Sequence, residues 1–157
     1  MRKEILFKLI EKIPGISYNE IVRETGLSNG VVSHYIIKLM EDGEIEKEGV
    51  TRGKYFIKNI GKKDRIIITL LRNKTNNDIF RYLIEKTNFE HAENANNIAK
   101  KVKKSGSTIS VSLKNLQKNN IVERVIMNKN SKLTNDIGFR ISNRKLWTKF
   151  FRKYNLW

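Results

Sequence analysis

The chain has 157 residues, and its 32 Lys and Arg side chains against 16 Asp and Glu give a formal net charge of +16, which favours a polyanionic partner. The absence of cysteine excludes disulfides and thiolate metal sites, and the two histidines and scattered carboxylates have no metal-ligand spacing, so we expect no cofactor. The longest nearly apolar run, residues 66–71, is far shorter than the ~20 residues of a membrane span. The sequence therefore predicts a cytoplasmic protein that does not span a membrane.

The first part of the chain has the pattern of three helices. Apolar residues at helical spacing predict a helix over residues 2–12. Ser17, with Glu20 three residues later, matches a capping box that opens a second helix. Gly26 supplies a turn to a third helix, expected over about residues 28–41.

A β-hairpin is expected directly after the third helix. Gly43 suits a left-handed C-cap, and residues 44–47 and 54–57 read as two strands. Residues 61–74 then form an apolar connector, for which we expect a helix rather than a strand. Thr75 with Asp78 resembles a short capping box that opens the next helix.

The chain repeats itself at an offset of 77 residues: Ser28 aligns with Ser105 and Leu39 with Leu116, and the apolar positions between them match conservatively. Asn120, which also tolerates a left-handed conformation, stands where Gly43 does. Lys103 stands where Gly26 does, so we expect the second turn to be made differently, toward Ser105 and Gly106. The second hairpin is expected over residues 121–127 and 137–141, with a longer polar tip.

A last helix, capped by Ser142 or Asn143, carries an aromatic stripe of Trp147, Phe150, Phe151 and Tyr154. Such a stripe more often closes the core of its own domain, and this is the favoured interpretation. The alternative is a homodimer formed through this helix or through the connector.

These elements predict a mainly α fold with small β-hairpin wings. It consists of two tandem winged helix-turn-helix domains joined by an apolar connector, followed by the C-terminal aromatic helix. The expected domains are residues 1–60 and 75–157, with the connector at 61–74.

Residues 27–45 resemble the recognition helix and exit of winged-helix regulators of the MarR and ArsR type, and residues 106–113 resemble them too. Two such modules in a short Lys-, Ile- and Asn-rich chain are similar to tandem winged-helix transcription regulators of archaea. The resemblance implies that the start of each third helix contacts bases, through Ser28, Asn29, Val31, Ser33 and His34 in the first copy, and Ser105, Ser107, Thr108, Ser110 and Val111 in the second. It also implies that the wings contact phosphate or the minor groove, through Arg52, Lys54, Lys129 and Lys132.

Further lysines beside these helices are candidates for phosphate contacts, namely Lys38, Lys103, Lys104 and Lys114. The charge is unevenly distributed. Residues 1–60 have a net charge of +1 and residues 61–157 have +15, so we expect the second domain to be the main electrostatic anchor on DNA. Contact of the first domain with DNA is an open question at this point.

The preferred hypothesis is a double-stranded-DNA-binding transcription regulator that reads the major groove with the third helix of one or both modules. One alternative is an architectural, chromatin-type protein with low sequence specificity. Another is a protein-interaction module of the transcription machinery, and RNA binding is a weaker option because the sequence has no RNA-binding signature. No nucleophile and base arrangement, phosphate loop or small-molecule effector site is evident, so we do not expect an enzyme.

Overall fold

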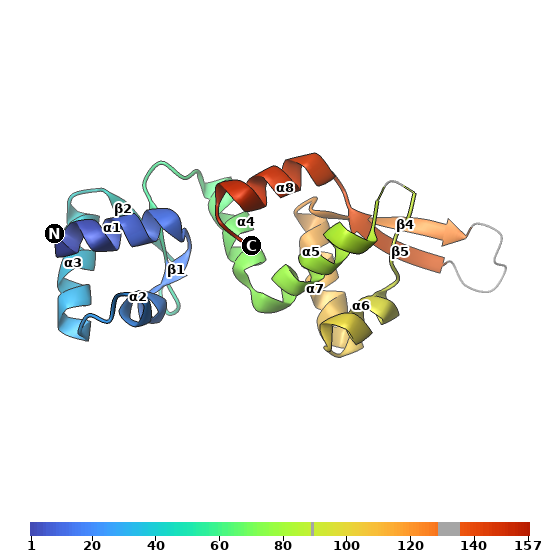
Figure 1. Cartoon of the computed structure of the whole chain (residues 1–157), viewed down its shortest axis with the longest axis horizontal. Helices are drawn as coiled ribbons and strands as arrows, with labels where there is room; N and C mark the ends of the chain where they lie inside the picture. The colour runs from blue at the N-terminus through green and yellow to red at the C-terminus, as the bar shows by residue number, and fades with distance from the viewer. Residues whose placement is uncertain (89, 129–135) are drawn as a thin grey trace. The chain divides into compact units, whose positions relative to one another are not determined.

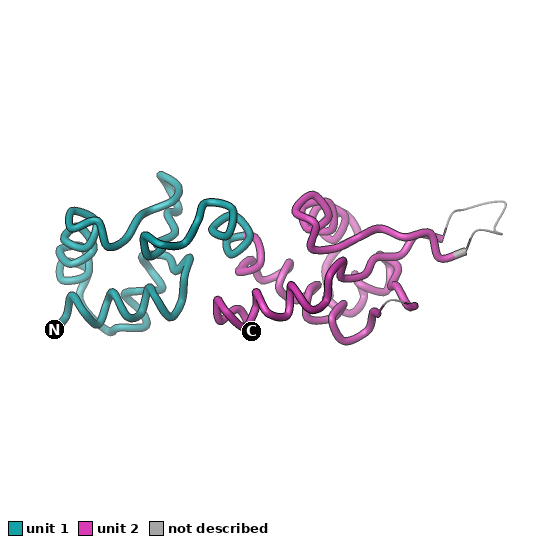
Figure 2. The backbone as a smooth tube through the Cα atoms, turned by 90° about the horizontal axis from the view of Figure 1, so that it is seen from above, with its two compact units in different colours: residues 1–69 teal, residues 70–157 magenta. Residues whose placement is uncertain are grey.

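The computed structural model describes residues 1–88, 90–128 and 136–157. The described part is mainly helical with two small antiparallel sheets, which confirms the predicted fold class at this level. It divides into two compact units, residues 1–69 (unit 1) and 70–157 (unit 2), coloured separately in Figure 2. Among the described residues, no helix is long and apolar enough to cross a membrane.

Unit 1 contains α1 (Arg2–Lys12), β1 (Ile16–Ser17), α2 (Tyr18–Thr25), α3 (Asn29–Glu41), β2 (Ile45–Glu48) and β3 (Lys54–Ile57). All of these except β3 are labelled in Figure 1. The sheet has the antiparallel order β1-β3-β2, so the short strand before α2 pairs with the returning strand of the hairpin. We call the β2–β3 hairpin wing 1.

Local signals set the helix ends of unit 1. Ser17 accepts a hydrogen bond from the Glu20 amide while the Glu20 carboxylate accepts one from the Ser17 amide, which confirms the predicted capping box. Gly26 ends α2 in the left-handed conformation (φ 66°), and Gly43 follows α3 in the same region (φ 69°).

The core of unit 1 lies where the three helices meet the sheet. It is built from apolar side chains of all these elements, namely Leu6, Ile10, Ile16, Ile21, Val32, Ile36, Leu39, Ile45 and Tyr55. These are the positions that the helical and strand periods predict to face inward. Their burial fixes which side of α3 is left for solvent.

Helix α4 (Lys62–Arg72) contains the apolar stretch of the expected connector, and the boundary between the two units falls within it. Its first turn is joined to unit 1 by Arg65, whose side chain is only 5% exposed. The guanidinium donates to Glu46 at 2.6 Å and Glu48 at 2.9 Å and also bonds the carbonyl oxygen of Ile60. The start of α4 therefore packs as part of unit 1.

Unit 2 contains α5 (Lys74–Lys86), α6 (Ala95–Val102), α7 (Gly106–Lys118), β4 (Val122–Asn128), β5 (Asp136–Ile141) and α8 (Arg144–Lys153). The β4–β5 hairpin is called wing 2. A bridge between Glu93 and Phe139 takes the place that the β1–β3 pair has in unit 1, where Ile16 pairs with Tyr55. The elements of the two units thus follow one another in the same order.

Two local predictions for unit 2 are wrong. Lys103 adopts the left-handed conformation itself (φ 60°, ψ 47°), so the turn after α6 is made as Gly26 makes it and is not displaced toward Ser105. Helix α5 begins at Lys74 with Asn73 as its N-cap, and Asp78 pairs with Lys74 instead of forming a box with Thr75. Asn120 is left-handed (φ 59°), as expected of the residue equivalent to Gly43.

The aromatic stripe of α8 packs into unit 2, in agreement with the favoured interpretation. Trp147, Phe151 and Tyr154 are buried, and the Phe151 ring stacks on Phe80 of α5 with ring centroids 3.9 Å apart. Asn143 caps the helix. Phe150, the fourth residue of the stripe, is half-buried, and Leu146 on the same helix is 51% exposed. Three of the four aromatic side chains thus close the core of their own unit, and a homodimer through this helix or the connector stays a prediction.

Candidate nucleic-acid interface

The first turn of α7 is organised by hydroxyl groups. Ser105 is the N-cap, and its Oγ accepts a hydrogen bond from the Thr108 amide at 3.3 Å. The same oxygen lies 2.9 Å from Thr108 Oγ1 and 3.1 Å from Ser107 Oγ. Ser105 and Thr108 therefore hold the helix start, and the side chains of all three residues are exposed.

One side of α7 faces solvent. Ile109, Ser112, Leu113 and Leu116 are buried, and this leaves Ser107, Ser110, Val111 and Lys114 exposed at helical spacing. Val111 is 59% exposed although it is apolar. The exposed face is thus made of short neutral side chains followed by a lysine, a composition that allows close approach to a base edge.

A groove of about 490 Å³ separates α7 from wing 2. Its apolar lining comes from Ala95, Leu113, Ile137 and Phe139, and its polar lining from Ser110, Lys114, Gln117 and Arg124. The charged lining residues are both basic. Arg124 was not among the contact residues predicted from the sequence, although it lines this groove. Its alignment with Lys47 in the repeat and its place on a strand of alternating pattern could have indicated it.

In unit 1 the predicted base-contacting residues lie at the start of α3. Ser28 is the N-cap and accepts from the Val31 amide at 3.4 Å, and Asn29, His34 and Lys38 are exposed. Val31 and Ser33 are half-buried. The Tyr18 hydroxyl donates to the carbonyl oxygen of Asn29 at 2.7 Å and so ties the start of α2 to that of α3.

The outer face of α3 differs from that of α7 in chemistry. Ile37 is 53% exposed and Met40 40% exposed. The aligned residues in unit 2 are Lys114 and Gln117. At these two positions the outer face of the helix is apolar in unit 1 and basic or polar in unit 2.

Many acidic groups of unit 1 are paired away from the start of α3. Lys3 contacts Asp42 at 2.5 Å and Glu44 at 2.8 Å, and its hydrogen bond lowers the pKa of Asp42 below the usual value. Arg65 similarly lowers the pKa of Glu46 by a hydrogen bond. Unit 1, with 13 basic and 10 acidic side chains, has a net charge of +3, and unit 2, with 19 and 6, has +13.

The remaining predicted contacts are distributed over turns and wings. Lys103 and Lys104 are exposed between α6 and α7, and Arg52 is exposed between the strands of wing 1. Lys54 is half-buried in β3. Lys129 and Lys132 lie outside the described residues.

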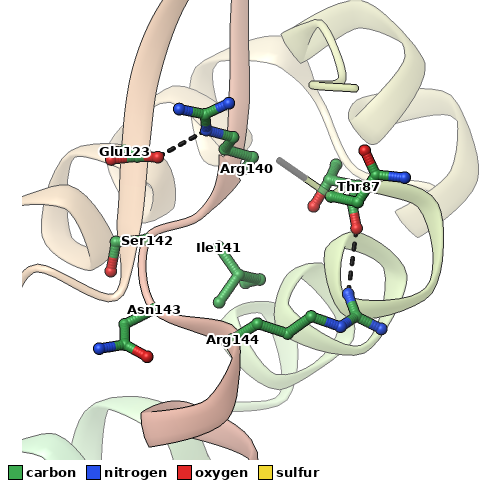
Figure 3. A pocket seen from close by; sticks show the side chains of 8 residues that line it. Thr87, Glu123, Arg140, Ile141, Ser142, Asn143 and Arg144 are labelled. Carbon is green, nitrogen blue, oxygen red and sulfur yellow. Dashed lines mark hydrogen bonds and ion pairs between the residues drawn. The ribbon is translucent and has the colours of Figure 1, made fainter. Parts of the chain in front are cut away.

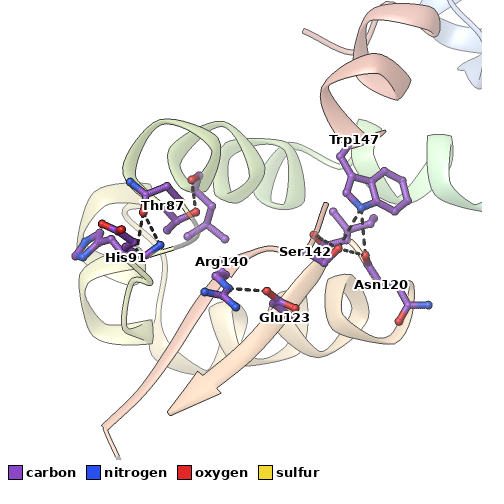
Figure 4. Close-up of polar contacts among 11 residues, drawn as sticks. Thr87, His91, Asn120, Glu123, Arg140, Ser142 and Trp147 are labelled. Atoms are coloured by element: carbon purple, nitrogen blue, oxygen red, sulfur yellow. Dashed lines mark hydrogen bonds and ion pairs between the residues drawn. The ribbon is translucent and has the colours of Figure 1, made fainter. Parts of the chain in front are cut away.

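A second cavity, of about 310 Å³, lies beside the start of α8 and is drawn in Figure 3. Its charged groups serve the fold: Arg140 Nε donates to Glu123 at 2.5 Å, and Arg144 donates to the carbonyl oxygen of Thr87 at 3.0 Å. Figure 4 shows a separate set of polar contacts nearby, in which the indole N–H of Trp147 donates to the carbonyl oxygen of Asn120 at 3.1 Å and to Ser142 Oγ at 3.3 Å. Among the described residues, no cluster of His, Asp or Glu is suited to a metal ion.

Comparison with known proteins agrees with the geometry of unit 1. Residues 2–46, which span α1 to the start of β2, match the family model of the winged helix-turn-helix DNA-binding type. No curated protein matches the chain. The chain therefore contains, in residues 2–46, a segment similar to winged helix-turn-helix DNA-binding domains.

Proposed function

We propose that the chain is a double-stranded-DNA-binding transcription regulator built from two tandem winged-helix modules, residues 1–60 and 75–157, with 61–74 as the connector. The observation that carries the proposal is the outer face of α7, on which Ser107, Ser110 and Val111 are short, uncharged and exposed. The family match of residues 2–46 supports DNA binding by the chain.

The proposed mechanism places α7 in the major groove. That groove admits one α-helix, and its base pairs present distinct donors, acceptors and thymine methyl groups. Ser107 and Ser110 can exchange hydrogen bonds with base edges, and Val111 can contact a thymine methyl group. Lys114, one turn further along α7, is placed to contact a phosphate.

The charge of unit 2 supports its role as the main anchor. A net charge of +13 attracts a polyanion. The slope of log affinity against log salt concentration is negative, and each neutralised phosphate makes it steeper by about 0.9. Unit 1, at +3, is expected to contribute less to that slope. In this proposal the second module contributes more of the affinity for DNA than the first.

The test uses full-length protein with matched substitutions at aligned positions. Val111→Glu places a negative charge on the outer face of α7, and His34→Glu places the same charge at the aligned exposed position of α3. Binding is measured on fragments selected from genomic DNA and on random DNA at matched salt. We expect Val111→Glu to weaken specific binding at least tenfold and His34→Glu to weaken it less. Wild-type affinity and sequence preference in Val111→Glu would contradict the proposal.

The same measurement separates a regulator from an architectural protein. A ratio of specific to random affinity of about 10³ or more is expected of a regulator, whereas a ratio near one is expected of a protein that coats DNA. The fold and the net charge are compatible with both functions, so the ratio decides between them.

A second candidate function for unit 1 is binding to a protein partner. The observation that favours it is the apolar outer face of α3, where Ile37 and Met40 are exposed. Ile37→Lys copies the aligned Lys114 of α7. If α3 faces a protein, this substitution should leave the sequence preference on DNA unchanged; if α3 reads DNA, the preference should change.

A further inference from the structure

The cavity of about 310 Å³ beside the start of α8 is bounded by segments that are far apart in the sequence (Figure 3). Thr87 and Asn88, at the end of α5, line it together with Asn143 and Arg144, at the start of α8. Cavities of roughly 300 Å³ and more have the usual size of small-molecule sites. The sequence indicated no such site, because only the packing of unit 2 brings these segments together.

Two asparagines in the lining present hydrogen-bond donors. The side-chain oxygen of Asn88 accepts from the amides of Glu90 and His91, both at 2.8 Å. That of Asn143 accepts from the Leu146 amide at 3.1 Å and so caps α8. Because each oxygen is used in this way, each side chain has its N–H₂ group left for a ligand. Among the described residues, neither N–H₂ group has an acceptor.

Arg144 adds a cation beside these donors. Its Nη1 donates to the carbonyl oxygen of Thr87 at 3.0 Å, which brings the guanidinium next to Asn88. Within the part of the chain that the structure describes, its other nitrogens have no acceptor. A guanidinium with donors on either side of it is suited to an oxyanion.

The acidic group in the lining is Glu123, which is already paired. Arg140 Nε donates to its carboxylate at 2.5 Å. With Arg144 included, the described lining has two arginines and one glutamate, a net charge of +1. The electrostatic preference of the cavity is therefore for an anion.

The cavity and the groove beside α7 lie on opposite faces of wing 2. Glu123 and Arg140 line the cavity, whereas their strand neighbours Arg124 and Phe139 line the groove. Successive side chains of a strand point to opposite faces of the sheet, which explains this division. A duplex held against α7 would leave the cavity open to a small molecule.

We propose that the cavity binds a small phosphate monoester, with its phosphate held by Arg144, Asn88 and Asn143 and its organic group against Ile141. A phosphate has three terminal oxygens, which match the guanidinium and the two N–H₂ groups. Ile141 is the large aliphatic side chain of the lining and is only 7% exposed. The inference goes beyond the proposed function and does not depend on DNA binding.

The first test is isothermal titration calorimetry of the full-length chain with phenyl phosphate at constant ionic strength. We expect saturable binding of one phenyl phosphate per chain. Inorganic phosphate should bind more weakly, because it has no apolar group to contact Ile141, and phenol should not bind. Absence of saturable binding of phenyl phosphate would overturn the inference.

Two substitutions remove donors while keeping the local fold. Asn88→Asp retains the oxygen that accepts from the Glu90 and His91 amides and replaces the N–H₂ group by a charged oxygen, so it should weaken phenyl phosphate binding about tenfold or more. Asn143→Ser retains an N-cap for α8 and should weaken binding roughly two- to tenfold. Lys145→Gln, on the exposed surface of α8, is the control and should bind like the wild type. Equal losses in Asn88→Asp and Lys145→Gln would show a general attraction to positive charge and would contradict a specific site.

A third substitution removes the cation of the site. Arg144→Gln should weaken phenyl phosphate binding about tenfold or more, and wild-type affinity would overturn the inference. Because Arg144 also bonds Thr87, the fluorescence of Trp147 and Trp157 in unit 2 is used to verify that the unit remains folded.

DNA binding in the absence of phenyl phosphate distinguishes a small phosphate ester from a phosphate of the DNA backbone. Asn143→Ser leaves the net charge unchanged and should bind DNA like the wild type, because the cavity lies on the opposite face of wing 2 from α7. A tenfold loss of DNA affinity in Asn143→Ser would mean that a backbone phosphate occupies the cavity, and the inference would be wrong. Val111→Glu tests the proposed function separately and should leave phenyl phosphate binding unchanged.

Discussion

The residue that ends the second helix of each unit adopts a left-handed conformation, and substitutions at this residue should change the stability of the two units in opposite directions. Gly26 ends α2 at φ 66°, and Lys103 ends α6 at φ 60°. This conformation costs a residue with a Cβ roughly 1–2 kcal/mol, and glycine avoids that cost but loses about 0.5–1 kcal/mol more conformational entropy on folding. We therefore expect Lys103→Gly to stabilise unit 2 by about 0.5–1 kcal/mol and Gly26→Ala to destabilise unit 1 by a similar amount.

No steric clash complicates the estimate for Gly26, because an added Cβ there would have no other atom within 4 Å. Tryptophan fluorescence reports on unit 2 selectively, since both tryptophans of the sequence lie in it. The expected rise in its melting temperature for Lys103→Gly is about 2–8 °C. Lys103→Ala is the control, because it removes the same charge and keeps a Cβ. Equal melting temperatures for Lys103→Gly and Lys103→Ala would refute the strain argument.

Three further predictions concern packing and ion pairs. Leu113→Ala and Ile36→Ala, at two buried positions, should each lower the free energy of unfolding by about 2–5 kcal/mol. Only Leu113→Ala should shift the unfolding transition seen by tryptophan fluorescence, and a shift in both variants would mean that the units do not unfold separately. Arg65→Met should lower the free energy of unfolding, followed by circular dichroism, by roughly 2–4 kcal/mol, because the carboxylates and carbonyl oxygens bound by the guanidinium lose their donor. The control Lys63→Met, on the exposed face of α4, should lower it much less. The hydrogen bond from Lys3 lowers the pKa of Asp42, so the pair contributes stability above the ordinary carboxyl pKa and loses it as pH falls through the lowered value. The stability difference between wild type and Lys3→Ala should therefore shrink as pH falls from about 5 to about 2, and a constant difference would contradict this.

Features that depend on neighbours along the chain could be predicted. The capping box of Ser17 and Glu20 and the left-handed Asn120 are confirmed, because each is satisfied within a few residues of backbone. The buried faces of α3 and α7 follow the helical period for the same reason, since Ile36 and Leu113 are placed by spacing alone.

Two local errors arose where packing outweighed a residue's own preference. Lys103 has a Cβ and disfavours the left-handed region, yet it adopts that region because α6 and α7 must each turn a buried face, led by Ile98 and Ile109, toward the core. Propensity is a weak guide where two helices are held on either side of a single turn. Similarly, Asn73 rather than Thr75 begins α5, and its side-chain oxygen accepts from the Asn76 amide.

The sequence by itself determined the repeated element pattern, the inward faces of α3 and α7 and the uneven charge, because these are properties of spacing and composition. Spacing alone did not suffice in α1, where Ile5, expected to face inward, is 49% exposed. Only the tertiary structure decided which side chains meet across elements. It paired Arg65 with Glu46 and Glu48, and it brought Arg124 of β4 to the same groove as Lys114 of α7. The physical reason is that an ion pair or a groove depends on distances between segments far apart in the chain, and those distances follow from the packing of the core rather than from any local pattern.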